Sequence, residues 1–298
     1  MNERTSDLRT KQARPLLAGV IGWPVAQSKS PLIFAHWFTA AGIAGAYRRL
    51  AVRPEEFAQT LRALPAAGFR GVNVTIPHKL AALEAADEAS AAARAIGASN
   101  TLCFDADGRT FAENTDAYGF TENLRDGAPS WDPAAGPALV LGAGGAARAV
   151  IHALLEAGVP GIRLANRTRA RARSLAAHFG PRVEAVGWSG RDRAVAGAAT
   201  IVNATSLGMA GNPPLELSLA AAPAAALVTD IVYTPLETPL LAAARARGLA
   251  AVDGLGMLLH QARPGFRAWF GIDPAVTPAL RRAVLDGTLG GTRPEGGA

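Results

Sequence analysis

The segment Gly142-Ala143-Gly144-Gly145-Ala146-Ala147 constrains the fold more than any other part of this chain. It has the form G-x-G-x-x-A and directly follows the apolar run 138–141. In such a turn the first glycine permits a tight bend, the second lets backbone approach a pyrophosphate, and the small third position lets helix pack on strand. The segment therefore predicts a strand, a phosphate-binding loop and a helix whose N-terminus attracts phosphate. Without its flanking elements it would indicate only a glycine-rich turn.

A second apolar run, 161–165, follows about 20 residues further on, as a dinucleotide-binding unit requires. It ends in Asn166, Arg167 and Thr168, where an NAD-binding unit would carry an acidic residue for the ribose 2′-hydroxyl. Because arginine binds phosphate through two parallel hydrogen bonds, this end favours NADP over NAD. The arginines that follow can equally form a solvated helix face: Arg169, Arg171 and Arg173.

Apolar runs alternate with stretches of helical length along the whole chain, which is typical of parallel sheets with crossover helices. The chain has 298 residues, enough for two domains at about 150 residues each. The Pro/Gly-rich segment 131–138 is the expected boundary, and 1–13 and 289–298 are expected to be flexible tails. The prediction is an α/β protein of two units, the second of them Rossmann-like.

The expected elements follow from these patterns. Ser30 is expected to cap a helix that has Pro31 in its first turn. A hairpin is expected around Asp107 and Gly108. The expected strands are 16–22, 46–52, 71–76, 99–104, the segment before Asn114, 138–144, 161–167, 200–205 and 226–233. The expected helices are 30–41, 54–64, 79–94 with a break near Asp87, a helix after Asp116, 145–157, 168–179, 240–248, 254–270 and 278–285.

Composition narrows the class of protein. A hydrophobic fraction of 49% excludes a disordered chain. Cys103 is the only cysteine, so an intramolecular disulfide or a cysteine-built metal site is impossible, and the five histidines lack metal-ligand spacing. The charged N-terminus does not resemble a signal peptide, and the uncharged stretch 194–215 contains asparagines, glycines and prolines that disfavour a membrane helix. We expect a soluble cytoplasmic protein with no metal.

The chain is basic, with a net charge of +6, yet only three of its 30 basic residues are lysines. The arginines are scattered among alanines rather than gathered into a nucleic-acid-binding run. The charge therefore favours attraction of an anionic small molecule over a nucleic-acid partner.

Polar motifs cluster in the first half of the chain. Ser28-Lys29-Ser30 follows an expected strand, where two hydroxyls and a helix start suit a carboxylate. The segment 73–79 puts Asn73 and Thr75 on one strand face with Lys79 just beyond it. Asn100-Thr101 and the segment 113–116 complete the set. Taken singly, each motif can also be an ordinary turn or cap.

Taken together, these motifs resemble the shikimate dehydrogenase family, and the resemblance runs from about Leu16 to Leu285. The matching pieces are GWPVAQSKSP, GVNVTIPHK, GASNT, ENTDAYGF, LGAGGAARAV, NRT, NATSLGM, DIVY and DGLGMLLHQA. The resemblance implies an N-terminal α/β substrate-binding domain of residues 14–116 plus 253–288. A Rossmann-like NADP-binding domain, 117–252, is inserted within it. The resemblance further implies an active site in the interdomain cleft that catalyses the reversible reduction of 3-dehydroshikimate to shikimate by NADPH.

The resemblance also implies roles for individual residues. Lys79 and Asp116 match the catalytic pair. The expected substrate-binding residues are Ser28 and Ser30 for the carboxylate, Thr75, Asn100 and Gln261 for the ring hydroxyls, and Tyr233 near the substrate. The expected cofactor-binding residues are Gly142, Ala143, Gly144, Gly145, Ala146, Ala147, Asn166, Arg167, Thr168, Ala204, Thr205, Ser206, Ile231, Gly254 and Met257.

The chemistry of the residues agrees with the first of these roles. Hydride transfer to a ketone creates an alkoxide that must gain a proton, so the site needs an acid near the carbonyl. Lysine can supply that proton where arginine cannot, because guanidinium stays charged. Asp116 would orient Lys79 and pass the proton onward. His78 is a second candidate acid, but as the neighbour of Lys79 it should point away.

Four alternatives stay open at this point. Relatives that act on quinate or amino-shikimate share the main motifs, and this chain has Gln27, Phe34 and Ser99 where many members differ. An NAD-dependent quinate enzyme should carry an acid near Arg167. A non-catalytic ligand sensor should lack Lys79 or Asp116. A methylene-tetrahydrofolate-type dehydrogenase shares the domain plan but not the SKSP and NTD motifs. The oligomeric expectation is a monomer or a homodimer.

Overall fold

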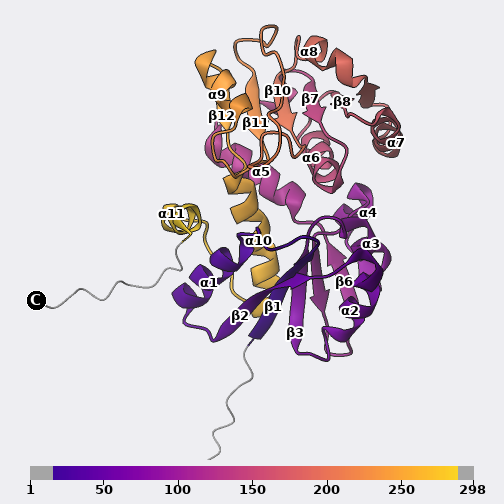
Figure 1. Cartoon of the computed structure of the whole chain (residues 1–298), viewed down its shortest axis with the longest axis vertical. Coiled ribbons are helices and arrows are strands. Elements are labelled where there is room, and N and C mark those ends of the chain that lie inside the picture. The colour runs from indigo at the N-terminus through magenta and orange to yellow at the C-terminus, as the bar shows by residue number, and fades with distance from the viewer. Residues whose placement is uncertain (1–15, 288–298) are drawn as a thin grey trace, which may run out of the picture.

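A computed structural model describes residues 16–287. The predicted tails 1–13 and 289–298 lie outside the described residues. The chain forms two α/β lobes, one above the other in Figure 1, with helices α5 (Asp116–Gly127) and α10 (Leu255–Phe270) running between them. Within residues 16–287, no helix combines the length and apolar character needed to cross a bilayer.

The first lobe contains a mixed six-stranded sheet in the order β2-β1-β3-β5-β6-β4. The strands β2, β1 and β3 are parallel, and β5 and β6 form the expected antiparallel hairpin. The strands are β1 (Leu16–Gly22), β2 (Gly45–Ala51), β3 (Phe69–Val74), β4 (Glu88–Ala89), β5 (Thr101–Phe104) and β6 (Thr110–Glu113). The helices are α1 (Ser30–Ala41), α2 (Phe57–Ala63), α3 (Lys79–Glu84) and α4 (Ala91–Ile96).

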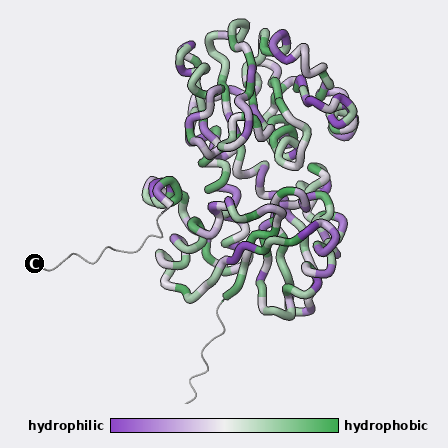
Figure 2. The backbone as a smooth tube through the Cα atoms, in the orientation of Figure 1, coloured by the Kyte–Doolittle hydropathy of each residue, from purple (hydrophilic) through white to green (hydrophobic). Residues whose placement is uncertain are grey.

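The second lobe contains a fully parallel six-stranded sheet in the order β12-β11-β10-β7-β8-β9, which is the Rossmann-like arrangement that the glycine-rich turn predicts. Its strands are β7 (Ala138–Leu141), β8 (Ile162–Ala165), β9 (Val183–Val186), β10 (Thr200–Asn203), β11 (Leu227–Asp230) and β12 (Ala250–Val252). Its helices are α6 (Gly145–Glu156), α7 (Arg169–Phe179), α8 (Arg191–Ala194) and α9 (Pro239–Ala246). In Figure 2 hydrophobic colour follows the strands inside this lobe, whereas α7 at its edge is largely hydrophilic.

The C-terminal helices complete the core of the first lobe. Phe266 and Trp269 of α10 pack against Phe34 of α1 and lie with it in one buried aromatic cluster. Leu280 of α11 (Pro278–Asp286) belongs to the same core. The N-terminal lobe is thus built from both ends of the described chain. The finer domain limits, 14–116 plus 253–288 and 117–252, stay a prediction.

Several expected elements differ in detail. Ser30 is not the cap of α1: Lys29 occupies that position, no side chain caps the helix, and the Oγ of Ser28 accepts from the Ser30 N–H at 3.3 Å. The third strand ends at Val74 rather than residue 76, because the chain turns at Thr75 and Pro77 has no N–H to continue the ladder.

The helical stretch 79–94 divides into α3 and α4, with the short strand β4 between them, and 54–64 begins as a 3₁₀ turn. The strands β9 and β12 and the four-residue helix α8 were absent from the sequence prediction. They are only three or four residues long, too short to give a clear hydrophobic period.

The two connecting helices interlock through glycines. A Cβ placed on Gly119 of α5 would lie 2.7 Å from the carbonyl oxygen of Met257 and 2.7 Å from the Cβ of Gln261. A Cβ placed on Gly256 of α10 would lie 1.9 Å from the Oδ1 of Asn123. Both separations are shorter than real Cβ contacts, so α5 and α10 cross this closely only because both positions are glycine.

We expect Gly119→Ala to lower the free energy of unfolding by about 1–3 kcal/mol, the usual cost of adding a methyl group to a packed contact. Urea denaturation measures the change. Gly190→Ala is the matched control, because a Cβ there meets no atom within 4 Å and should change stability little. Equal stability of the two variants would contradict the interlock.

Candidate active site

A cavity of about 170 Å³ lies at the junction of the two lobes. It is lined by the loop after β1, the end of β3, the start of α3, the starts of α5 and α10, and the segment after β11. The eight residues predicted to bind substrate or act in catalysis all line it: Ser28, Ser30, Thr75, Lys79, Asn100, Asp116, Tyr233 and Gln261. Three of the predicted cofactor-binding residues line it as well: Ile231, Gly254 and Met257.

The parallel sheet explains why these motifs meet. The strands β1 and β3 run in the same direction side by side, with Ile21 opposite Val74. Their carboxyl ends therefore deliver the serine motif and the segment 75–79 to one edge of the sheet, where α/β proteins bind ligands. The helices α5 and α10 then bring Asp116 and Gln261 to the same edge.

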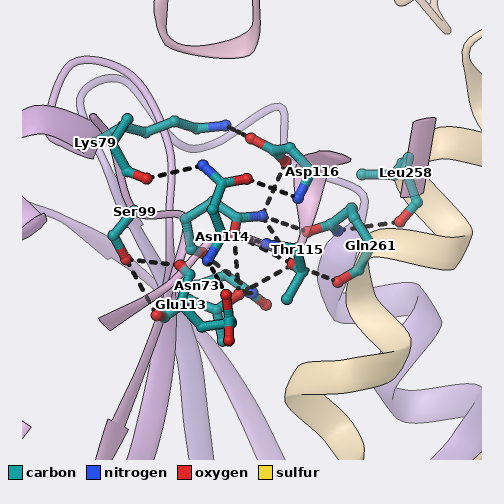
Figure 3. Close-up of polar contacts among 12 residues, drawn as sticks. Asn73, Lys79, Ser99, Glu113, Asn114, Thr115, Asp116, Leu258 and Gln261 are labelled. Carbon is teal, nitrogen blue, oxygen red and sulfur yellow. Dashed lines mark hydrogen bonds and ion pairs between the residues drawn. The ribbon is translucent and has the colours of Figure 1, made fainter. Parts of the chain in front are cut away.

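Lys79 and Asp116 form an ion pair through Nζ and Oδ2. Their side chains are only 11% and 8% exposed, so water screens the pair little. Each is the first residue of its helix, α3 and α5, and the carboxylate of Asp116 suits that helix end. In Figure 3 the side chain of Lys79 extends toward Asp116, with Thr115 and Gln261 lying below them.

The amide of Asn100 joins this pair to α10. Its Nδ2 donates to the Oδ1 of Asp116 at 2.8 Å and lies 3.2 Å from the Oε1 of Gln261. Its Oδ1 accepts from the N–H of Thr115 at 2.7 Å. The hydroxyl of Thr115 in turn donates to the carbonyl of Gln261 at 2.8 Å. One buried amide therefore sets the orientation of Asp116 relative to both the first lobe and α10.

A second polar group forms the floor of the cavity. Asn73 donates through Nδ2 to the hydroxyl of Thr101 at 3.0 Å and accepts at Oδ1 from the hydroxyl of Tyr47 at 2.7 Å. Burial raises the pKa of Tyr47 well above its usual range, so its hydroxyl keeps its proton and acts as a donor. Asn73 is buried and its oxygen and nitrogen are both engaged, which fixes the face that it presents to the cavity.

The glycine-rich loop has the shape that a dinucleotide needs. Gly142 has a φ of +111°, and a Cβ there would lie 2.6 Å from the carbonyl oxygen of Ala204, which confirms the tight turn. Gly144 has open space in front of it, and α6 begins with no side-chain cap, so the first N–H groups of the helix are available to an anion. These features fit a pyrophosphate.

The loop also touches the ion pair. A Cβ on Gly145 would lie 3.1 Å from the Cδ of Lys79, so the start of α6 packs against the lysine side chain. Asn166, Arg167 and Thr168 stand at the end of β8, away from the cavity, and Arg167 and Thr168 are exposed to solvent. The predicted cofactor residues thus lie in two regions of the second lobe, the loop beside Lys79 and the end of β8.

Buried polar pairs hold the segments that contain the other predicted cofactor residues. Asn203 at the end of β10 donates to the Oδ1 of Asp230 at the end of β11 at 3.0 Å, and its own Oδ1 accepts from the N–H of Thr205. Asp230 also accepts from the N–H of Val232 and the hydroxyl of Thr238, while burial raises its pKa. This network holds the loop that contains Ala204, Thr205 and Ser206 beside the segment that starts at Ile231.

The sequence does not predict the place or role of several residues in and around the cavity. The sequence predicts Asn73 on the same strand face as Thr75 but predicts no role for it. Tyr47 lies in an expected strand with no polar motif around it, so nothing in the sequence singles it out. The apolar lining was also not foreseen: Val20, Val25, Val74 and Leu258. His78 points away as expected, stacking on Phe57 and bonding the carbonyl of Val52 at 2.8 Å. Among residues 16–287, no three His, Cys, Asp or Glu side chains gather as metal ligands would.

Comparison with known families gives three consecutive matches along the chain. Residues 20–102 match the shikimate dehydrogenase substrate binding domain, and residues 132–210 match the family described as shikimate / quinate 5-dehydrogenase. Residues 254–285 match the shikimate 5′-dehydrogenase C-terminal domain.

Individual relatives cover nearly the whole chain. The shikimate dehydrogenase (NADP(+)) of Paracoccus denitrificans is 58% identical over 269 residues, covering 90% of this chain and 95% of its own. The structure of shikimate 5-dehydrogenase from Thermus thermophilus in complex with NADP(H) and shikimate is 40% identical, with a TM-score of 0.80 and coverage of 91% and 99%. The quinate dehydrogenase of Corynebacterium glutamicum in complex with NAD is 34% identical, with a TM-score of 0.85 and the same coverage.

Proposed function

Because the chain belongs to the shikimate dehydrogenase family, we propose that it catalyses the reversible NADPH-dependent reduction of 3-dehydroshikimate to shikimate. It is accordingly an oxidoreductase acting on a CH–OH group, with a place in the biosynthesis of chorismate and the aromatic amino acids. The observation that carries the proposal is one cavity, beside the glycine-rich loop, that is lined by the eight residues to which the family resemblance assigns substrate binding or catalysis.

Each part of the cavity has a task in substrate binding. Ser28 and Ser30 donate hydroxyl hydrogen bonds to the substrate's carboxylate. Thr75, Asn100 and Gln261 bind its ring hydroxyls, and Tyr233 closes the site from the second lobe. Four of these residues carry hydroxyls and two carry amides, so the site orients a small polyhydroxylated acid by hydrogen bonds from several sides.

Lys79 supplies the proton. Bound NADPH would supply the hydride to the carbonyl carbon of the substrate. The ammonium of Lys79 gives its proton to the oxygen that becomes the hydroxyl, and in the oxidation direction the neutral amine takes it back. Asp116 holds Lys79 in place through the ion pair and is itself held by Asn100, so the two residues exchange protons as a unit.

NADP is the cofactor that the second lobe suits. The loop 142–147 binds the pyrophosphate, and the segments at Ala204–Ser206, Ile231, Gly254 and Met257 surround the nicotinamide. Asn166, Arg167 and Thr168 take the 2′-phosphate. Arg167 is exposed at the end of β8, and no acidic residue stands beside it there to repel that group.

A quinate-type activity is the second candidate, because a quinate dehydrogenase that binds NAD shares this fold at a TM-score of 0.85. The end of β8 argues against it, because an NAD-dependent enzyme is expected to carry an acidic residue there and this chain has Asn-Arg-Thr. We further propose that the enzyme is cytoplasmic and acts as a monomer or a homodimer.

The direct test follows the absorbance of NADPH and NADH with 3-dehydroshikimate, and of NADP⁺ and NAD⁺ with shikimate and with quinate. The proposal requires the highest kcat/KM for shikimate with NADP⁺. A preference for quinate with NAD⁺ would replace it with the second candidate.

Replacing Lys79 with alanine should lower kcat by about 10²–10⁴-fold, the usual contribution of a general acid, with little change in shikimate binding. Lys79→Arg is the informative partner variant, because it keeps a positive charge beside Asp116 but cannot release a proton at neutral pH. Both variants should lose turnover in steady-state assays. Near-normal turnover of Lys79→Arg would make Lys79 a structural cation.

Replacing Arg167 with alanine should weaken NADPH binding by about 1.5–3 kcal/mol, the range for charge-assisted hydrogen bonds, and leave NADH nearly unchanged. The measurement is kcat/KM for both cofactors at fixed ionic strength, since salt screens phosphate contacts. Arg173→Ala, on the exposed face of α7, serves as the control for lost charge. Equal losses for both cofactors would mean that Arg167 only supports the loop.

A further inference from the structure

The proposed carboxylate site has no cation of its own. Among the described residues that line the cavity, the only charged side chains are Lys79 and Asp116, and they neutralise each other. Ser28 and Ser30 are neutral. An anion that leaves water for such a site loses hydration, and hydroxyl donors alone compensate this incompletely. The charge balance of the cavity therefore calls for a positive group just outside it.

Arg49 of β2 occupies that place. Its Nε and Nη2 donate to the backbone carbonyl of Ser28 at 3.1 and 2.6 Å. The strand pairing sets Arg49 opposite Val20 of β1, which itself lines the cavity. Within residues 16–287, no carboxylate forms an ion pair with Arg49. Its positive charge therefore lies directly behind the serine motif and is not cancelled there.

The alternation of side chains along β2 explains the direction in which Arg49 points. Tyr47, two residues earlier, points to the same side of the strand and donates to Asn73 on the cavity floor. Leu50 packs on the opposite side, in the core formed with Ile21 and Phe57. Arg48 shares the Leu50 side. Tyr47 and Arg49 thus lie on one side of the strand, where they bond cavity-lining residues, and the neighbouring Arg48 carries the same charge on the other side.

The other cation of the serine motif is engaged elsewhere. The Nζ of Lys29 donates to the backbone carbonyl of Val284 on α11 at 3.1 Å. It ties the motif to the C-terminal helix. Of these two cations, Arg49 is the one that bonds the serine residue itself.

We propose that Arg49 positions Ser28 and supplies the positive charge that selects a carboxylate at this end of the substrate. The inference rests on the proposed function, because it takes the serines to be the carboxylate site. Two hydrogen bonds from one rigid guanidinium hold the backbone carbonyl of Ser28, and with it the backbone position from which the hydroxyl projects. Arg49 is exposed to solvent, so its charge is screened by salt, with a Debye length of about 8 Å at physiological ionic strength.

The test compares a charged and an uncharged ligand in Arg49→Gln. The variant should raise the KM for shikimate about three- to tenfold, the span for one partly exposed charge with its hydrogen bonds, while kcat and the KM for NADP⁺ stay within twofold. The inhibition constant of the methyl ester of shikimate, which lacks the negative charge, should change by less than twofold. Arg48→Gln removes the same charge from the other face and should leave all these constants near wild type.

The salt dependence of the KM for shikimate distinguishes an effect of the charge of Arg49 from a purely structural effect. The wild-type KM for shikimate should rise between about 50 and 300 mM salt, and the rise should be shallower in Arg49→Gln because screening then acts on less charge. Arg49→Lys, which keeps the charge without the two-armed contact, should keep the wild-type salt dependence. This variant also covers the case in which Arg49→Gln fails to fold.

Three results would overturn the inference: equal weakening of shikimate and its ester, equal effects of Arg48→Gln and Arg49→Gln, or an unchanged salt dependence in Arg49→Gln. None of them concerns the proposed function. That function fails separately, if the wild-type enzyme shows no turnover of shikimate or 3-dehydroshikimate with either cofactor.

Discussion

The amide of Asn100 is the contact on which the rest of the site depends. It bonds Asp116 at one atom and the start of α5 at the other, and it reaches Gln261 on α10. All of these groups are buried, so each hydrogen bond that is lost would leave a polar group without water to replace it. Asp116 can therefore hold Lys79 in only one orientation. The geometry of this ion pair thus depends on the uncharged amide of Asn100.

The crossing of α5 and α10 carries that geometry between the lobes. These two helices connect the first lobe to the dinucleotide-binding lobe, and Gly119 and Gly256 let them approach until backbone meets side chain. Lys79, on the first lobe, then packs against Gly145 at the start of α6 in the second. The ion pair and the glycine-rich loop therefore meet at one lysine. The cation proposed for the carboxylate, Arg49 of β2, likewise lies behind the serine motif.

Much of this arrangement could be predicted from the sequence, because its chemistry sits in short motifs at strand ends. The glycine-rich turn predicted the parallel sheet of the second lobe, and eight separate residues were expected in one site and line one cavity. Tyr47 and Arg49 could not be found in this way, since their roles arise from strand pairing and from partners distant in sequence. Ser30 was expected to cap α1, but Lys29 takes the cap position and Ser30 lines the cavity.

The central claim is that Lys79 delivers a proton to the carbonyl oxygen of the substrate when hydride adds to the carbonyl carbon. A crystal structure of the enzyme with shikimate and NADP⁺ tests it most directly. The account predicts the Nζ of Lys79 at about 2.6–3.2 Å from the hydroxyl that becomes the ketone, with the serine hydroxyls on the carboxylate. A substrate bound in the reverse orientation, with its carboxylate at Lys79 and another side chain on the reacting hydroxyl, would contradict the account.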